Sequence, residues 1–255
     1  MALVTGVSRR AGIGFAVAER LLAEGASVFC HSWSAHDAEQ PWGADPLGTE
    51  GVLAALGSAA GRLDHAELDL GVAENCTNLV DQVVERFGAL DILVVNHARS
   101  SKLALAEVTA EELDAAWAVN TRASILLTQA FAARHDGDRP GGRVVLFTSG
   151  QHRGPMPSEL PYAVSKGAIA QMTATLADAL VDRGITLNTV NPGPTDTGWA
   201  TPELAAQVGR ALPRGRWNRP DEIAAVVAWL ASDEAATIVG QIIDTEAGFR
   251  RWEVP

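Results

Sequence analysis

The chain contains few of the residues that indicate a secreted, metal-dependent or nucleic-acid-binding protein. Only two of its 255 residues are cysteine, Cys30 and Cys76, and their spacing matches no pattern of metal ligands. Lys and Arg number 20 against 31 Asp and Glu, so the formal net charge is −11 at pH 7. This acidic balance argues against a basic surface for nucleic acid or anionic lipid. We therefore expect no nucleic-acid partner, no membrane partner and no bound metal.

Long apolar segments are also absent. No segment approaches the roughly 20 apolar residues that a helix needs to span a bilayer. The chain starts directly with a strand-like segment at residues 1–5, without the basic and then apolar stretch of a secretory signal. Together with the two cysteines, these features predict a reduced protein of the cytoplasm.

Short apolar segments alternate along the chain with longer segments of helical periodicity. The alternation is typical of βαβ units, and it predicts one α/β domain, residues 1–255, with a doubly wound, Rossmann-like parallel sheet. Ser34–Gly57, rich in Gly, Pro and Asp, is expected to be an extended loop with room for a short helix. The expected strands are Leu3–Thr5, Ser27–His31, Asp91–Val95, Arg143–Thr148, Ile185–Val190 and Gly240–Asp244, and helical spacing occurs in 15–22, 79–87, Leu113–Phe131, Pro161–Asp182 and Pro220–Leu230.

A glycine-rich turn joins the first expected strand to the first expected helix. Gly6, Gly12 and Gly14 fall in this turn, together with Ser8 and Ile13. Glycines at such a junction let the backbone approach a pyrophosphate at the positive end of the helix. A tight turn without a ligand also uses glycine, but the position at the first βα junction of an alternating chain favours a dinucleotide site.

The residues expected near the adenosine ribose favour NADP(H) over NAD(H). An acidic residue usually closes the second strand where NAD is bound. Here that region ends in His31-Ser32-Trp33, and no carboxylate follows until Asp37. Arg9 and Arg10 lie in the glycine turn, where a guanidinium can clamp a 2′-phosphate. The other interpretation is that both arginines are solvated loop charges.

The chain has a single tyrosine, Tyr162, and one of its two lysines, Lys166, follows four residues later. At the start of an expected helix this spacing places both side chains on one face. The pKa of a free tyrosine is near 10, and a neighbouring ammonium lowers it. Ser149 follows an expected strand, at the edge of the sheet where ligands bind. The three residues therefore predict proton transfer to a carbonyl oxygen that a hydroxyl polarises.

Taken in order, these residues resemble the short-chain dehydrogenase/reductase family over nearly the whole chain, and within it the β-ketoacyl-(acyl carrier protein) reductases. The resemblance implies a catalytic tetrad in which Tyr162 is the acid/base, Ser149 orients the substrate, Lys166 binds the ribose and Asn120 positions a water. The cofactor-binding residues that it implies, together with those of the glycine turn, are Gly6, Ser8, Arg9, Arg10, Gly12, Ile13, Gly14, Ser32, Asp69, Leu70, Asn96, Ala98, Tyr162, Lys166, Pro192, Gly193, Thr195 and Thr197.

The sequence departs from the family pattern in three places. The glycine turn is about two residues longer than usual, with Arg9 and Arg10 in the extra length. His97 and Arg99 stand where the family has small or amide residues, and the loop Ser34–Gly57 is longer than typical. His97 is interpreted as a substrate contact, as an extra proton relay or as a packed side chain. His152 is interpreted either as facing the substrate or as a loop residue.

The family also implies a mobile lid, here around residues 195–217. Its apolar residues, which include Trp199 and Trp217, would favour a hydrophobic substrate, or would instead pack against a neighbouring subunit. Four arginines follow each other closely in an acidic chain, and they would attract a phosphorylated or carrier-bound acyl substrate, or would form a solvated face or salt bridges between subunits. They are Arg210, Arg214, Arg216 and Arg219.

The function predicted from these residues is hydride transfer between a nicotinamide cofactor and a carbonyl or alcohol substrate. A β-ketoacyl thioester and a secondary-metabolite or sugar-like ketone both remain open as substrates. The alternative is a nucleotide-sensing or scaffold protein without turnover, which the presence of both Tyr162 and Lys166 disfavours. The resemblance implies a homotetramer, with a dimer as the next choice.

Overall fold

In the computed structural model, seven parallel strands form one sheet in the order β3-β2-β1-β4-β5-β6-β7. The structure describes residues 1–57, 61–139 and 141–253. The chain passes from the β1 side of the sheet to the β4 side after β3, and this reversal opens a crevice at the carboxyl ends of the strands. The strands are β1 Ala2–Thr5, β2 Val28–Ser32, β3 Leu63–Glu67, β4 Ile92–Val95, β5 Gly142–Phe147, β6 Ile185–Asn191 and β7 Ile242–Asp244.

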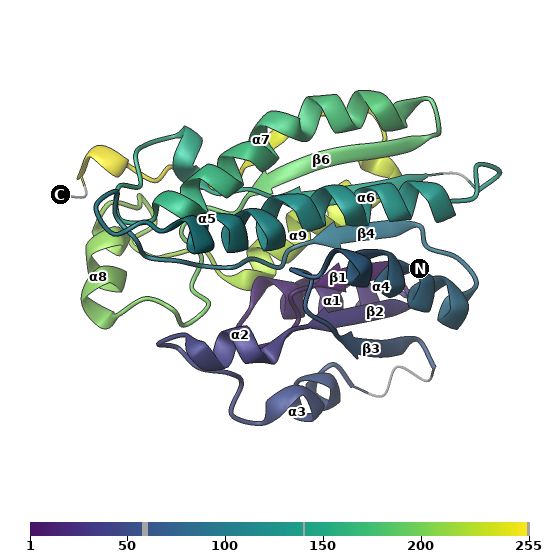
Figure 1. The fold of residues 1–255 in the computed structure, drawn as a ribbon, viewed down its shortest axis with the longest axis horizontal. Coiled ribbons are helices and arrows are strands. Elements are labelled where there is room, and N and C mark those ends of the chain that lie inside the picture. Colours follow the sequence, from purple (N-terminus) through teal and green to yellow (C-terminus); the bar gives the residue numbers. More distant parts are fainter. Residues whose placement is uncertain (58–60, 140, 254–255) are drawn as a thin grey trace.

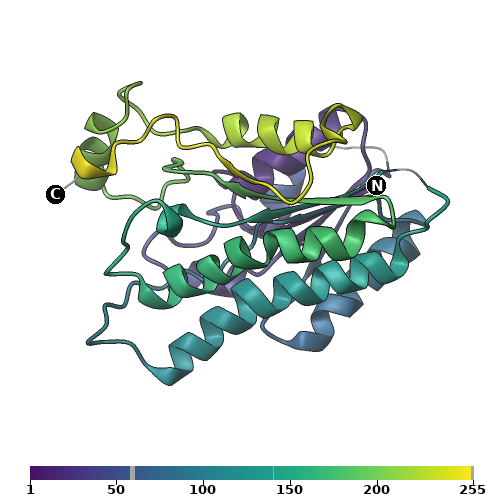
Figure 2. The same ribbon diagram turned by 90° about the horizontal axis from the view of Figure 1, so that it is seen from above.

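Helices cover both faces of the sheet. Helices α1 and α9 pack together on one face, and α4, α6 and α7 lie on the other (Figures 1 and 2). The helices α2, α5 and α8 lie toward the carboxyl ends of the strands (Figure 1). The helices are α1 Ile13–Ala23, α2 Ser34–Glu39, α3 Gly48–Ala55, α4 Ala73–Phe87, α5 Ala110–Ala116, α6 Ala123–Arg134, α7 Leu160–Val181, α8 Pro202–Arg210 and α9 Pro220–Leu230.

The central strands are buried on both faces, which explains their nearly continuous apolar sequences. Successive side chains of a strand point to opposite faces. In β1, Leu3 therefore packs in the core under α4, α6 and α7, whereas Val4 packs in the core under α1 and α9. All residues of β1, β2, β5 and β6 are buried. This double burial fixes the sheet and with it the edge that carries the polar residues of the site.

The predicted fold class is confirmed, a single Rossmann-like α/β domain, but three local predictions are incomplete or wrong. Strand β3 was not predicted from the sequence, because Leu-Asp-His-Ala-Glu has no apolar pattern. This polar composition fits the position of β3 at the edge of the sheet. Ser34–Gly57 holds two short helices, α2 and α3, and is not an extended loop. The helix expected at Leu113–Phe131 is longer, and a π-helical segment at Trp117–Arg122 separates α5 from α6.

Within the described ranges 1–57, 61–139 and 141–253, no helix combines the length and apolar character needed to cross a membrane.

Candidate active site

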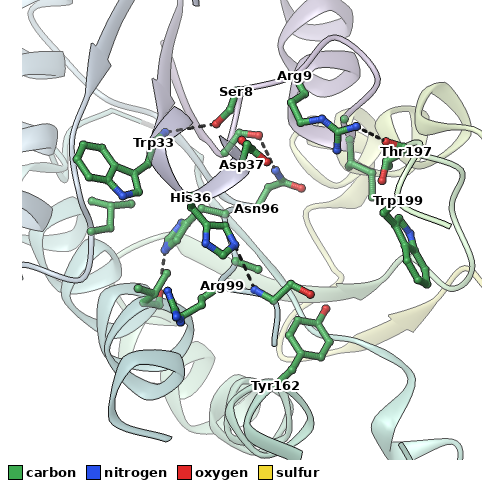
Figure 3. Close-up of a pocket in the computed structure, with 18 of the residues that line it drawn as sticks. Ser8, Arg9, Trp33, His36, Asp37, Asn96, Arg99, Tyr162, Thr197 and Trp199 are labelled. Carbon is green, nitrogen blue, oxygen red and sulfur yellow. Dashed lines mark hydrogen bonds between the residues drawn. The ribbon is translucent and has the colours of Figure 1, made fainter. Parts of the chain in front are cut away.

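A cleft of about 830 Å³ lies at the carboxyl ends of the strands (Figure 3). It collects residues from segments far apart in the sequence, because the ends of parallel strands meet at one edge of the sheet. Most of the predicted site residues line it: Gly6, Ser8, Arg9, Gly12, Ile13, Asp69, Leu70, Asn96, Ala98, Ser149, Tyr162, Pro192, Gly193, Thr195 and Thr197. The predicted residues outside the lining are Arg10, Gly14, Ser32, Asn120 and Lys166.

The glycine turn has the close packing that a dinucleotide site requires. Gly6 has a φ of +74°, and a Cβ atom on Gly14 would lie 2.3 Å from the Gly6 carbonyl oxygen. The Asn96 Nδ2 donates to the carbonyl oxygens of Thr5 and Gly6 at 3.0 and 3.2 Å, which holds the turn against the end of β4. Helix α1 begins after Gly12 without a side-chain cap. Its first amides and its positive end therefore fit a pyrophosphate.

The two arginines of the turn take different directions. Arg10 makes an ion pair with Asp45, in which its Nε and Nη2 donate to the carboxylate at 2.9–3.1 Å, and its backbone amide donates to the same carboxylate. Arg9 lines the cleft, and its Nη2 donates to the Thr197 carbonyl oxygen at 2.9 Å (Figure 3). Only Arg9 is therefore placed to meet a ligand of the cleft.

The structure also turns Ser32 away from the cleft. Ser32 ends β2, is fully buried, and its hydroxyl lies 2.8 Å from the His65 Nε2 on the neighbouring strand β3. The wall of the cleft beyond β2 is formed instead by α2 and the residues on either side of it. None of these lining residues was predicted from the sequence. They are Trp33, Ala35, His36, Asp37, Glu39 and Trp42.

Tyr162 lines the cleft from the first turn of α7, with Ser149 at its side. Burial raises the pKa of Tyr162 to about 12, and the Ser149 side chain acts in the opposite direction. The Lys166 Nζ lies 5.9 Å from the centroid of the Tyr162 ring and donates to the Phe147 carbonyl oxygen at 2.8 Å. Burial lowers the pKa of Lys166 to about 7.

These pKa shifts differ from the sequence-based expectation that the ammonium lowers the pKa of the phenol. Desolvation of Tyr162 outweighs the other effects in this structure. With a pKa of about 12, the phenol holds its proton at neutral pH.

Asn120 lies in the π-helical segment and is buried behind the cleft. Its Nδ2 donates to the Arg99 carbonyl oxygen at 3.0 Å and to the Ser165 hydroxyl at 2.9 Å, and its Oδ1 accepts from the Arg99 amide at 2.7 Å. Asn120 therefore ties the segment after β4 to α7 next to Lys166. The water-positioning role that the resemblance implies stays a prediction.

His97 makes hydrogen bonds with both ring nitrogens. Its Nε2 lies 2.9 Å from the Val119 carbonyl oxygen, and its Nδ1 lies 2.8 Å from the Thr5 hydroxyl. A carbonyl oxygen only accepts, so the Nε2 carries the proton and the Nδ1 accepts from Thr5. Burial lowers the pKa of His97 to about 3, so the ring is neutral. These contacts favour the interpretation of His97 as a packed side chain.

The second histidine considered from the sequence, His152, lies on the rim of the site. Its Nδ1 contacts the Ser149 carbonyl oxygen at 3.2 Å and its Nε2 lies 3.1 Å from Asp244. It joins the loop after β5 to the end of β7, so it supports the backbone of Ser149.

The predicted lid has a small apolar cluster of its own. Trp199 and Trp217 meet edge to face with ring centroids 5.5 Å apart, and Val208 and Leu212 complete the cluster with them. Of the two tryptophans, Trp199 lines the cleft, whereas the Trp217 Nε1 donates to the Ala205 carbonyl oxygen within the lid.

The arginine cluster is largely explained by ion pairs within the chain. Arg214 and Arg216 both pair with Glu222, and Arg219 pairs with Asp221. These three pairs lie within the chain, and so differ from the salt bridges between subunits that were expected from the sequence.

Lys102 and Glu159 are further ionisable residues of the cleft that were not identified from the sequence. The Lys102 Nζ lies 5.5 Å from the centroid of the Trp199 ring. Burial raises the pKa of Glu159, and the charge of Lys102 acts in the opposite direction. Glu159 lies three residues before the acid/base candidate, at the N-cap position of α7.

Across the part of the chain that the structure describes, no cluster of three or more His, Cys, Asp or Glu side chains is arranged to hold a metal ion.

Comparisons with known proteins agree with this geometry. Residues 6–250 match a family model described as Enoyl-(Acyl carrier protein) reductase. The Uncharacterized oxidoreductase YjdA of Bacillus subtilis (strain 168) is 37% identical over 252 residues, which cover 98% of this chain and 97% of that protein. A short-chain dehydrogenase/reductase from Serratia marcescens BCRC 10948 superimposes with a TM-score of 0.84 at 33% identity, covering 97% of this chain and 96% of that one.

A second solved structure gives the same agreement and adds a cofactor. It is a short-chain dehydrogenase from Burkholderia cenocepacia J2315 in complex with NADP, with a TM-score of 0.84, 33% identity, and coverage of 97% of this chain and 96% of that one. The family-model match over residues 6–250 includes the glycine turn, the tyrosine helix and residues 195–217. The chain therefore belongs to the short-chain dehydrogenase/reductase family and is an NAD(P)-dependent oxidoreductase.

Proposed function

We propose that the enzyme reduces a carbonyl compound with NADPH, and catalyses the reverse oxidation of the alcohol, with Tyr162 as the acid/base. The observation that carries the proposal is the position of the only tyrosine in the chain. Tyr162 lines the cleft together with Ser149, and has the ammonium group of Lys166 buried behind its ring.

The glycine turn and the strand ends supply the groups that would hold the cofactor. The α1 amides would bind the pyrophosphate, Asp69 and Leu70 would contact the adenine, and residues 192–197 would hold the nicotinamide. When bound, the cofactor supplies the hydride for reduction and accepts it for oxidation.

The proton for the substrate carbonyl oxygen would come from the protein's own residues. A phenol with a pKa of about 12 is protonated at pH 7, so Tyr162 is ready to donate to a carbonyl oxygen. The Ser149 hydroxyl would polarise the same oxygen. This protonation state supports reduction as the favoured direction at neutral pH, and oxidation as the direction that gains from higher pH.

A panel of ketones and aldehydes with NADPH tests the proposal against a nucleotide sensor. The enzyme is expected to oxidise NADPH only when a carbonyl compound is present, and the absorbance at the wavelength of the reduced nicotinamide measures this. A protein that binds NADPH tightly but oxidises it with no member of the panel would be a sensor.

The preference for NADP(H) over NAD(H) is proposed to depend on Arg9 and not on Arg10. Arg9 lines the cleft with one hydrogen bond to a backbone oxygen, so further N–H groups remain for a phosphate, whereas Asp45 occupies Arg10. We expect Arg9→Ala to lower kcat/KM for NADPH by about tenfold to hundredfold, as loss of a charge-assisted hydrogen bond does. Arg10→Ala is the matched control and should change it by less than about threefold.

The same measurement with NADH shows which phosphate Arg9 contacts. If Arg9 binds the 2′-phosphate, Arg9→Ala lowers kcat/KM for NADPH and leaves the value for NADH unchanged. An equal loss with both cofactors would place Arg9 at the pyrophosphate, and a preference of the wild type for NADH would refute the NADP(H) proposal.

We further propose a homotetramer in the cytoplasm with residues 195–217 as the lid. The helical region 110–134 and α7 both leave apolar side chains exposed on their outer faces, and such faces are buried in symmetric assemblies. The exposed apolar residues are Leu113, Trp117, Ile125, Val164 and Val181. Light scattering on the purified protein would measure the number of chains in the assembly.

The cytoplasmic location is supported by the cysteines. Both cysteines are free and buried, which supports a reducing compartment.

A further inference from the structure

Two side chains of opposite charge line the cleft near Tyr162 without a charged partner. Glu159 is half-buried, and its carboxylate makes no hydrogen bond and no ion pair with any residue in the described ranges. Lys102 contacts the face of the Trp199 ring and, among the same residues, no carboxylate within ion-pair distance. The mechanism proposed above uses neither group. A carboxylate that is partly removed from water and unpaired in a binding cleft points to a polar partner on the ligand.

The backbone brings both groups close to the acid/base residue. The Leu160 amide donates to the Leu103 carbonyl oxygen at 3.0 Å, which fastens the segment of Lys102 to the first turn of α7. Glu159 directly precedes this helix, and Tyr162 lies in its first turn. The charge of Glu159 raises the pKa of Tyr162, so the two groups are within electrostatic range of each other. A substrate whose carbonyl oxygen contacts Tyr162 therefore places its adjacent atoms near Glu159 and Lys102.

We infer that the substrate is a ketone with a hydroxyl group on a carbon next to the reacting carbonyl, and that Glu159 and Lys102 select for this hydroxyl. This inference rests on the proposed reductase function. A hydroxyl is the smallest group that both donates and accepts, so it donates to the Glu159 carboxylate while its oxygen accepts from the Lys102 ammonium. Reduction adds the hydride to the carbonyl carbon and the Tyr162 proton to the carbonyl oxygen, so the product is a vicinal diol.

The charges around the site disfavour the competing substrate groups. An aliphatic acyl chain offers no donor, so binding it would bury the Glu159 carboxylate without a partner. An ammonium group would pair with Glu159 but would lie near Lys102 and close to the buried Lys166, and like charges at close range repel. The hydroxyl is the group that satisfies the carboxylate and the ammonium together.

Matched ketones measure this selection. We would compare kcat/KM for 3-hydroxy-2-butanone and 2-butanone with NADPH, which differ by one hydroxyl. The wild type is expected to favour the hydroxyketone by about tenfold to a hundredfold, less than for a fully buried polar site, because the Glu159 side chain is only half-buried. Glu159→Gln, which keeps the shape and one acceptor, should reduce this ratio, and Glu159→Leu should bring it close to one.

Two further variants test whether the ratio of kcat/KM values depends on the charges in the cleft or changes with any substitution of a charged residue. Lys102→Met should lower the same ratio, but less than Glu159→Leu, because Lys102 is exposed and solvated. Glu19→Gln alters an exposed carboxylate of α1 that does not line the cleft, and should leave the ratio at the wild-type value.

The outcomes distinguish this inference from the reductase function itself. If ketones are reduced but the wild-type ratio is one or lower, or Glu159→Leu keeps the full ratio, the hydroxyl selection is refuted and the reductase function stands. A higher kcat/KM for 1-amino-2-propanone or for an acetoacetyl thioester than for the hydroxyketone would also refute it. If no carbonyl compound is reduced at all, both fail together.

Discussion

Replacement of Tyr162 by phenylalanine is expected to lower kcat for carbonyl reduction by about 10³-fold or more, since a positioned general acid contributes about 10²–10⁴-fold and no second tyrosine is present. The Kd for NADPH should change by less than about twofold, because the change removes one hydroxyl and keeps the ring that lines the cleft. Steady-state rates with a saturating ketone measure the first quantity, and fluorescence titration measures the second.

Ser149→Ala provides the comparison for Tyr162→Phe. It removes the hydroxyl that lines the cleft with Tyr162 but leaves the proton donor in place, so its loss of kcat should be large yet smaller than that of the tyrosine variant. Turnover of Tyr162→Phe within about tenfold of the wild type would show that another group delivers the proton.

Replacement of Lys166 by methionine is the second change with a large expected effect. The ammonium is fully buried next to the Tyr162 ring, so its loss should lower kcat by about 10²-fold or more through the position and electrostatics of the phenol. The fold should tolerate the change, because methionine has a similar length and removes a group that burial destabilises when it is charged.

The stability of Lys166→Met should depend on pH in a defined direction. The pKa of Lys166 is lowered from 10.5 to about 7 in the folded protein, so between these values the unfolded chain binds more protons and wild-type stability rises with pH. Below pH 7 the buried lysine is charged and its destabilising effect is complete. The difference in Tm between Lys166→Met and the wild type should therefore be more favourable to the variant at pH 6 than at pH 9. A difference independent of pH would contradict the lowered pKa.

The main architecture could be predicted from the sequence, because it follows from periodicities within short segments. Six of the strands and the principal helices can be predicted from the spacing of their apolar residues. The topology of a parallel sheet then brings Gly6, Asn96, Ser149 and Gly193 to one edge. Strand β3 could not be predicted in this way, because it lies at the sheet edge and carries Asp64, His65 and Glu67 in place of apolar residues.

The remaining features of the site depend on contacts between distant segments. The pairing of Arg10 with Asp45 depends on how the chain between α2 and α3 folds back onto the glycine turn, and local patterns do not determine this. The segment of Lys102 is joined to the start of α7, next to Glu159, by the backbone hydrogen bond between Leu160 and Leu103. The raised pKa of Tyr162 could not be predicted either, because desolvation depends on everything that packs around the phenol.

A crystal structure of the enzyme with NADP⁺ bound would show whether Tyr162 lies where a proton donor must lie. We predict the nicotinamide ring beside the Tyr162 hydroxyl and Ser149, the Lys166 ammonium directed toward the nicotinamide ribose, and the pyrophosphate at the start of α1. A nicotinamide ring remote from Tyr162, with Lys166 still bound only to the Phe147 carbonyl oxygen, would contradict the assignment of this tyrosine as the proton donor.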